Sequence, residues 1–160
     1  MSAYMRMNLN QMVLSNQFYQ NLTTRAYYEL VYSYLKAAEI YYPEFRKWYT
    51  EKVIPELFTS NRELIVENRN DDIAGIAIVK KEENKLCTLR ITEDFQNKGI
   101  GLKLFEKSFE SLNTGKPFLT VSEEKLVEFE KIFKYYGFKM TSIHKDLYRK
   151  GKKEYFFNEM

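Results

Sequence analysis

A glycine-rich stretch, Gln96-Asn97-Lys98-Gly99-Ile100-Gly101, stands between a strand-like segment and a helical segment. The strand-like segment runs from Leu86 to Thr92, and apolar residues recur at helical spacing after the stretch, at Leu102, Phe105, Phe109 and Leu112. The first backbone N–H groups of a helix have no partner within it, and the helix dipole favours negative charge there, so such a junction binds phosphate oxygens. Glycine at Gly99 and Gly101 also lets a diphosphate approach the backbone closely. The stretch predicts a loop for a phosphate-bearing ligand, although two glycines can also mark a plain flexible turn.

The loop matches neither of two common nucleotide-binding patterns. Gly101 is followed by Leu102 and Lys103, whereas a P-loop needs Gly-Lys-Ser/Thr, and the third glycine of a dinucleotide-binding loop is missing. The strand before the loop follows other strands at short turns instead of opening a βαβ unit, which argues against a Rossmann domain. Gln96 and Lys98 can add side-chain donors, and Lys103 can add charge at the rim.

The N-terminal part of the chain predicts one strand and two helices. We expect a strand over Met7–Ser15, a helix from about Thr24 to Pro43, and a second helix over Glu44–Phe58 that ends or kinks near Pro55. The apolar, β-branched segments that follow predict an antiparallel meander of three strands with short turns, over residues 62–68, 73–80 and 86–92.

The C-terminal part predicts two helices and three strands. The helix after the loop is expected to end at residues 113–116, with Gly115 as its C-terminal cap. A short strand over Pro117–Val121 leads to a helix that Ser122 caps and Gly137 ends. Its buried face would carry Leu126, Phe129, Phe133 and Tyr136, and a hairpin of strands over residues 138–148 and 154–158 would close the chain.

These elements predict one domain over residues 1–160. Its fold class would be α+β, a mixed, mostly antiparallel twisted sheet flanked by helices, in the order β-α-α-β-β-β-α-β-α-β-β. A net charge of +3 does not indicate a nucleic-acid binder, no apolar run approaches a membrane span, and no signal-peptide segment opens the chain. A single cysteine, Cys87, favours the cytoplasm. Six bases and one acid between Lys139 and Lys153 indicate either a solvated hairpin or a patch for an anionic partner.

The spacing Gln96-x-x-Gly99-x-Gly101 resembles the [Gln/Arg]-x-x-Gly-x-Gly/Ala signature of the GNAT superfamily of N-acetyltransferases. The order of elements from Met7 to Asn158 is similar to that family, as is the Gly137-Phe138 pair after the last long helix. The resemblance implies acetyl-CoA as cosubstrate, no metal, and direct attack of an acceptor amine on the thioester.

The resemblance also implies a set of site residues. In this family the strand before the loop splays away from its neighbour at a bulge, and the pantetheine arm pairs with the exposed backbone. The cofactor-binding positions implied in this chain are Leu89, Arg90, Ile91, Gln96, Asn97, Lys98, Gly99, Ile100, Gly101, Leu102, Lys103 and Phe133. A backbone N–H near Ile91 is the natural donor to the developing oxyanion.

The expected proton donor departs from the family pattern. Many members place a tyrosine four residues before the Gly-Phe pair, where this chain has Phe133. Tyr136, about one turn further along the helix, is the candidate catalytic tyrosine, with a packing role as the alternative. Glu93 and Asp94 are the nearest acids, but they fit exposed turn residues better than a general base. The only histidine, His144, is expected to decorate the hairpin, and Cys87 to be a buried structural thiol on the same strand face as Leu89.

The acceptor side would be built from the N-terminal helices and the final hairpin. Aromatic residues concentrate in those helices, where most would pack and some would line an acceptor pocket or an oligomer interface. The acceptor would be an amine on a small molecule or a protein, and no membrane partner is expected. Two alternatives remain open: a toxin-like acetyltransferase acting on aminoacyl-tRNA, motivated by the basic stretch, and a non-catalytic acyl-CoA-binding domain, motivated by Phe133.

Overall fold

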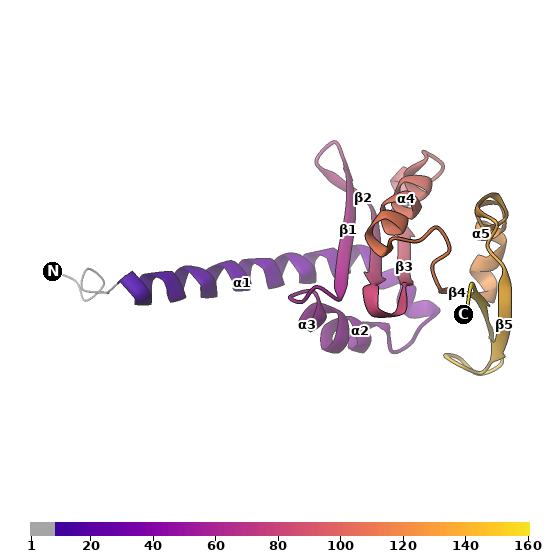
Figure 1. The fold of residues 1–160 in the computed structure, drawn as a ribbon, viewed down its shortest axis with the longest axis horizontal. Coiled ribbons are helices and arrows are strands. Elements are labelled where there is room, and N and C mark those ends of the chain that lie inside the picture. Colours follow the sequence, from indigo (N-terminus) through magenta and orange to yellow (C-terminus); the bar gives the residue numbers. More distant parts are fainter. Residues whose placement is uncertain (1–8) are drawn as a thin grey trace. The chain divides into compact units, whose positions relative to one another are not determined.

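The computed structural model describes the backbone of residues 9–160 and the side chains of residue 20 and residues 22–160. The chain divides into two compact units, one ending at Tyr34 and the other covering Leu35–Met160. Helix α1, Leu9–Leu35, forms the described part of the first unit up to Tyr34, and its last residue belongs to the second unit (Figure 1). The predicted strand over Met7–Ser15 is therefore wrong for Leu9–Ser15, whereas Met7 and Asn8 lie outside the described residues. That stretch holds the good helix formers leucine, glutamine and methionine with one β-branched residue, Val13, and its helix continues into the one predicted from Thr24.

The second unit begins with helical turns. A 3₁₀ turn, Lys36–Ile40, is followed by α2 (Phe45–Trp48), a π-helical turn (Tyr49–Val53) and α3 (Ile54–Glu56). This run confirms the helix predicted over Glu44–Phe58. It ends one residue beyond Pro55, which has no N–H to donate to the preceding turn.

Three strands form the predicted antiparallel meander. They are β1 (Arg62–Arg69), β2 (Asp72–Lys80) and β3 (Lys85–Ile91), in the order β1-β2-β3. The β2–β3 register shifts between the pairs Ile78–Thr88 and Val79–Leu86, so β3 carries one extra residue. This bulge corrects the expected position of Cys87. Leu86, Leu89 and Ile91 pack in or against the core, whereas Cys87 lies beside Arg62, whose Nη1 is 3.3 Å from its Sγ.

Helix α4, Ile100–Leu112, packs against this sheet. Its buried face starts at Ile100 and continues through Leu104 and Phe105. The predicted face is wrong in one residue, since Leu102 is 43% exposed and Leu104 takes the buried position. The predicted cap is also wrong, because Asn113, with φ +54°, ends the helix in the left-handed conformation expected of Gly115.

Gly75 on β2 lets α4 approach the sheet. A Cβ atom there would stand 2.7 Å from Leu104 Cδ1, 2.9 Å from Ile100 Cγ2 and 3.3 Å from the Arg90 carbonyl oxygen. We expect Gly75→Ala to lower the free energy of unfolding by about 1–3 kcal/mol, the usual cost of overpacking. Gly101→Ala is the matched control. Its Cβ would meet only Ile91 Cδ1 at 4.0 Å, so it should raise stability by roughly 0.5–1 kcal/mol. Urea unfolding of both variants measures the difference, and equal midpoints would contradict this packing.

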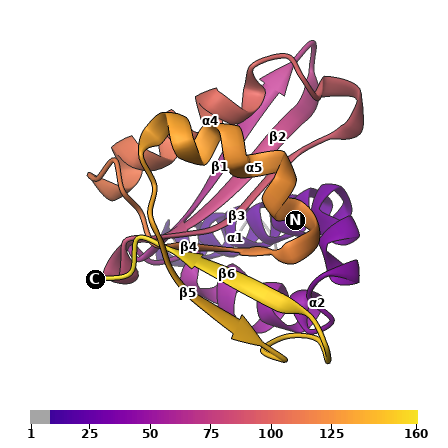
Figure 2. The same ribbon diagram turned by 90° about the vertical axis from the view of Figure 1, so that its right-hand side faces the viewer.

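The remaining strands form a second sheet. Its strands are β4 (Leu119–Ser122), β5 (Met140–Lys145) and β6 (Lys153–Phe157), antiparallel in the order β4-β6-β5. Helix α5, Glu123–Tyr136, lies along β4 and β6, and Gly137 ends it at φ +70° as predicted (Figure 2). Ser122 occupies the N-cap position, but its hydroxyl makes no capping hydrogen bond.

Both sheets contribute to one hydrophobic core. Ala77 and Leu86 from the first sheet and Leu119 and Phe157 from the second belong to the same buried cluster as Phe105 of α4. The architecture confirms the predicted fold class of mixed, mostly antiparallel strands flanked by helices.

Candidate active site

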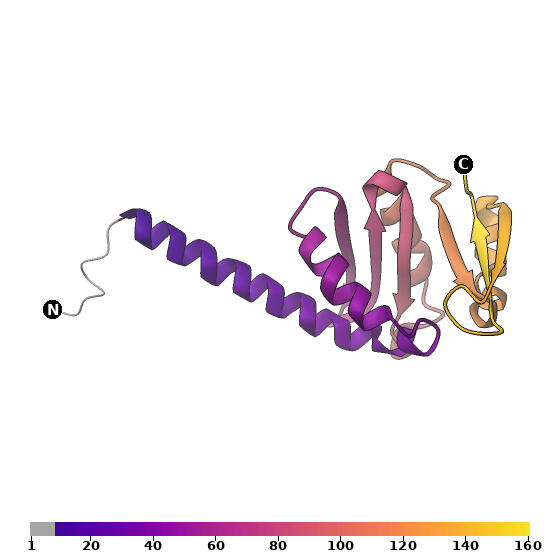
Figure 3. The same cartoon turned by 90° about the horizontal axis from the view of Figure 1, so that it is seen from below.

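Strands β3 and β4 run parallel but are joined at one end only. The Leu86 N–H donates to the Phe118 carbonyl (3.0 Å), and the Phe118 N–H donates to the Asn84 carbonyl (2.9 Å). Beyond this bridge the two strands belong to separate sheets, which stand side by side in Figure 3. The separation begins next to the bulge at Cys87, as the resemblance to the GNAT superfamily implied. The β4-facing edge of β3 is therefore left without a ladder of hydrogen bonds.

The direction of the β3 backbone groups follows from the ladder with β2. The Thr92 N–H donates to the Ala74 carbonyl (3.0 Å), and Arg90 lies opposite Ile76 two residues earlier. Because donors alternate along an antiparallel strand, Arg90 also bonds to β2, whereas Leu89 and Ile91 direct their N–H and C=O groups to the opposite edge. Those are the two backbone positions expected to pair with an extended ligand.

The glycine loop presents free backbone donors at the far end of β3. Asn97 and Gly99 have φ values of +62° and +79°, and Gly99 is followed directly by α4. Among the described residues, none accepts a hydrogen bond from the backbone N–H groups of residues 97–102. A Cβ atom on Gly99 would meet nothing within 4 Å. The loop is therefore open to a ligand that brings its own acceptors, as phosphate oxygens do.

The loop side chains divide between the solvent and the core. Ile100 is buried under the sheet, whereas the other predicted loop contacts are exposed, namely Gln96, Asn97, Lys98, Leu102 and Lys103. The Lys98 ammonium lies 5.6 Å from the centre of the Phe95 ring, which holds it beside the loop. Glu93 and Asp94 form an exposed 3₁₀ turn with Phe95, as expected of turn acids.

The two aromatic candidates on α5 lie inside the protein. Phe133 is 4% exposed and packs against Phe157, with ring centres 4.7 Å apart. The Tyr136 ring meets Phe109 edge-on at 4.8 Å, and its hydroxyl is buried with no hydrogen-bond partner among the described residues. Burial raises the pKa of Tyr136, with further contributions from Glu106 and Tyr135. These aromatic surroundings favour the packing role that is the alternative for Tyr136.

The acetyl transfer that the resemblance implies is expected to be unchanged in Tyr136→Phe. The substitution removes a buried hydroxyl that has no partner, so folding stability should stay the same or rise slightly. Steady-state rates and thermal unfolding of the variant check both statements. A fall in rate of about 10²–10⁴, the usual contribution of a general acid, would assign the proton transfer to Tyr136 after all.

A buried carboxylate that the sequence did not reveal lies on the opposite face of the second sheet from α5. Glu154 of β6 is 4% exposed. Its Oε2 accepts hydrogen bonds of 2.8 Å from the Tyr42 hydroxyl and 2.8 Å from Thr120 Oγ1. The Tyr148 ring meets the Tyr42 ring edge-on, with centres 5.1 Å apart. We call these four residues the Glu154 cluster, and they join β4, β6, the β5–β6 turn and the segment before α2.

The electrostatics of the cluster follow from its burial. Burial raises the pKa of Glu154, while the hydrogen bonds from Thr120 and Tyr42 and the charge of Arg149 lower it in part. Burial and the neighbouring Glu154 carboxylate raise the pKa of Tyr148, and that of Tyr42 lies far above its usual range for the same reasons. Both tyrosines are therefore neutral, and Glu154 is the one group of the cluster that can carry a negative charge.

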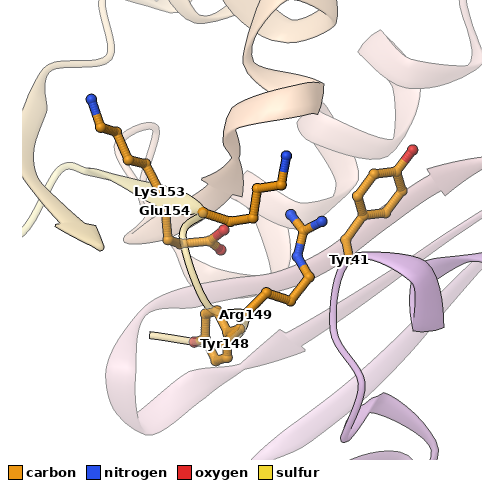
Figure 4. A pocket seen from close by; sticks show the side chains of 6 residues that line it. Tyr41, Tyr148, Arg149, Lys153 and Glu154 are labelled. Atoms are coloured by element: carbon orange, nitrogen blue, oxygen red, sulfur yellow. The ribbon is translucent and has the colours of Figure 1, made fainter. Parts of the chain in front are cut away.

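A small cleft of about 160 Å³, counted with its opening to solvent, borders the cluster. Its lining consists of Tyr41, Tyr148, Arg149, Lys152, Lys153 and Glu154 (Figure 4). Figure 4 shows Arg149 beside Tyr41, whereas Lys153 points away from Glu154. Arg149 donates two hydrogen bonds, of 2.8 and 2.7 Å, to the Glu124 carboxylate. Lys152 lies 3.6 Å from the same carboxylate, so part of the basic stretch is neutralised within the protein.

Cys87 and His144 lie outside the Glu154 cluster. Burial raises the pKa of the Cys87 thiol, which disfavours a nucleophilic thiolate and fits the predicted structural role. His144 is exposed on β5, with Nε2 3.0 Å from Ser142 Oγ. Among the described residues, no three metal-ligating side chains of the histidine, cysteine, aspartate and glutamate types gather at one point. No described helix has the length and apolar character required to cross a bilayer.

The sequence matches a family model described as the acetyltransferase (GNAT) domain over residues 29–153. Among curated proteins, none matches the chain.

Solved structures share its fold. A spermidine N-acetyltransferase chimera from Vibrio cholerae and hSSAT superposes with a TM-score of 0.57 at 15% identity, covering 81% of this chain and 86% of that one. The ribosomal-protein alanine N-acetyltransferase from Escherichia coli superposes with a TM-score of 0.54 at 16% identity, covering 64% and 72%. An aminoglycoside 6'-N-acetyltransferase complexed with coenzyme A gives 0.52 at 12% identity, covering 75% and 84%. At these identities the likeness concerns the fold alone.

Proposed function

The chain belongs to the GNAT acetyltransferase family, and on this premise we propose that it is an acetyl-CoA-dependent N-acetyltransferase that moves the acetyl group directly to an acceptor amine. One observation carries the proposal: β3 and β4 separate beyond Phe118, and the free edge of β3 leads to a loop of unpaired backbone donors. An extended cosubstrate with a diphosphate at one end needs both features together. The single cysteine leads us to place the reaction in the cytoplasm.

We assign the cosubstrate to these two features. The pyrophosphate lies against the N–H groups of residues 97–102, with Gln96, Lys98 and Lys103 as side-chain donors and Ile100 contributing its backbone only. The pantetheine arm pairs with the backbone of Leu89 and Ile91, whose polar groups face the free edge. We retain Arg90 and Phe133 as proposed contacts of the arm. Phe133 is buried, so its contribution is to the apolar core behind the arm.

Catalysis then requires three contributions from the chain. The site must hold the amine against the thioester carbonyl, which replaces a collision by a positioned attack. The Ile91 N–H donates to the oxygen on which negative charge develops. The amine must also lose a proton, because an ammonium group has no lone pair for the attack.

Acetyl-CoA is expected to raise the melting temperature of the protein. At a concentration 100 times its Kd, a ligand adds about 2.7 kcal/mol to the free energy of unfolding. For a domain of this size that corresponds to roughly 5–10 °C. Differential scanning fluorimetry with acetyl-CoA and longer acyl-CoAs checks this result, with adenosine as the control ligand that lacks a diphosphate. No shift with any acyl-CoA would count against the proposal.

A non-catalytic acyl-CoA-binding domain is the second candidate function. The observation in its favour is that Phe133 has no proton to give and that the Tyr136 hydroxyl is buried. It predicts the same thermal shift with no release of free CoA in the presence of amines. Transfer of acetyl to any amine of a broad panel would eliminate it.

A further inference from the structure

Glu154 is a buried carboxylate without a cationic partner. Its hydrogen-bond donors are the neutral hydroxyls of Tyr42 and Thr120, and among the described residues no lysine or arginine forms an ion pair with it. Arg149, the cation that lowers the pKa of Glu154, is bound to Glu124 on both of its terminal nitrogens. Burying a charge without a counter-ion is costly, so a carboxylate in this position is suited to a cation that arrives from outside.

The cluster lies where β3 and β4 begin to separate. Thr120 stands two residues beyond Phe118, the residue of β4 that bridges to β3. On the side of β3, Cys87 occupies the bulge and is close enough to Tyr148 to affect its pKa. Glu154 therefore lies beside the separation point, on the sheet face opposite α5, since its neighbours Tyr155 and Phe157 pack with the core. An amine that attacks a thioester held in the opening between β3 and β4 can come from that face.

We infer that the Glu154 carboxylate, held by Tyr42 and Thr120, binds the ammonium group of the acceptor and accepts its proton before the attack. This inference rests on the proposed function. The ammonium gives one proton to a Glu154 oxygen, and the free amine nitrogen forms a bond to the thioester carbonyl carbon. As the carbon–sulfur bond breaks, the sulfur keeps the electron pair and takes up the second proton lost by nitrogen. Glu154 returns its proton to water, so each turnover yields the amide, CoA thiol and one proton.

The residues around Glu154 also restrict the chemical class of amine that can serve as the acceptor. The cleft around the single carboxylate carries the cations Arg149, Lys152 and Lys153, while the Tyr41 and Tyr148 rings form its apolar side. A monoamine finds one carboxylate for its ammonium and aromatic faces for its carbon atoms. A polyamine would bring further positive charges against Arg149 and Lys152. The acceptor class is therefore a primary monoamine whose remainder is neutral or anionic.

Glu154→Gln is the direct test, made on the full chain. The wild type should release CoA from acetyl-CoA with n-butylamine or an alanyl peptide faster than with spermidine. In the variant, kcat/KM should fall by about 10²–10⁴, while the acetyl-CoA Kd stays the same. In the wild type, kcat/KM should rise with pH through the Glu154 pKa, because the base must be ionised, and this limb should be absent from the variant. The titratable groups facing Glu154 are the neutral Tyr42 and Tyr148 and the charged Arg149, Glu124, Lys152 and Lys153, so the profile needs all of them intact.

Tyr42→Phe is a second variant with a readout that a merely structural role would not move. The Tyr42 hydrogen bond lowers the pKa of Glu154, so the loss of this bond should shift the acidic limb of the pH profile to higher pH.

The loss of the Glu154 charge in Glu154→Gln does not by itself endanger folding. Because burial raises the pKa of Glu154, its contribution to stability is present below the unfolded pKa and is lost as pH rises through the folded value.

The outcomes separate the two proposals. Turnover in Glu154→Gln within about threefold of the wild type, with the acidic limb intact, overturns the inference and leaves the proposed function standing. Faster reaction with spermidine overturns the acceptor class. If the wild type shows no turnover with any amine, binding of n-butylamine by NMR decides the matter, since loss of that binding in Glu154→Gln supports the ammonium site and equal binding overturns it.

Discussion

Gly99→Glu is expected to abolish the rise in melting temperature that acetyl-CoA produces. Gly99 has φ +79°, a conformation in which a side chain costs roughly 1–2 kcal/mol. Its missing side chain also leaves open the space in front of the loop donors. A carboxylate placed there would stand where the diphosphate is bound. Like charges in contact cost several kcal/mol, so affinity should fall by about 100-fold or more.

Gly151→Glu is the matched control for this substitution. Gly151 has φ +78° and a Cβ atom there would also meet nothing within 4 Å, but it lies in the turn between β5 and β6. The two variants therefore carry the same residue, charge and backbone strain. Scanning fluorimetry over a series of acetyl-CoA concentrations should show the wild-type shift for Gly151→Glu and none for Gly99→Glu. Equal shifts would remove the loop from the binding site.

Ile91→Pro should lower kcat by about 10²–10³ while the protein stays folded. Proline removes one backbone N–H, and at this position the N–H faces the free edge of β3 instead of β2. The ladder with β2 therefore loses no hydrogen bond. Removing one donor to a developing oxyanion carries a rate cost of this size in other acyl-transfer enzymes. Single-turnover acetyl transfer at saturating acetyl-CoA measures it.

Two controls distinguish the N–H from its surroundings. Ile91→Ala keeps the N–H and loses only side-chain packing, so its kcat should stay near the wild-type value. Arg90→Pro removes an N–H that bonds to β2, so it should destabilise the sheet itself. If Ile91→Ala is as slow as Ile91→Pro, the side chain and not the N–H is responsible.

Most of the fold could be predicted from patterns among residues that are close together in the sequence. The three strands of the meander and the helix after the glycine loop are predicted from neighbouring residues, and the structure has them where expected. The glycine loop was predictable as a loop for the same reason, because a helix that starts directly after Gly99 is a local feature of the sequence. The match to the GNAT family model agrees with the resemblance drawn from this loop.

The predictions were wrong mainly where contacts between residues far apart in the sequence determine the position of a side chain. Cys87 sits at a bulge that only the pairing with β2 reveals, so simple alternation put it on the wrong face. Leu102 and Leu104 are both apolar, and the buried one is fixed by the position at which α4 meets Gly75. A strand was predicted at the N-terminus because three or four apolar residues fit either periodicity.

Glu154 could not be identified from its neighbours. It follows two lysines in a segment that looks like a solvated strand. Its burial depends on Tyr42, 112 residues earlier, and on Thr120, 34 residues earlier, so the signal exists only in the folded chain. A local motif in the sequence can indicate a phosphate-binding loop. The residue that binds the acceptor is harder to identify, because it can come from any strand that reaches the site.

The most direct test of the proposed function is transfer of an isotopically labelled acetyl group from acetyl-CoA to a panel of primary amines, followed by mass spectrometry of the products. We expect a labelled N-acetyl product with at least one monoamine, formed in equal amount to free CoA and absent for Gly99→Glu. CoA release without labelled product, or no reaction with any amine while acetyl-CoA still stabilises the protein, would contradict it.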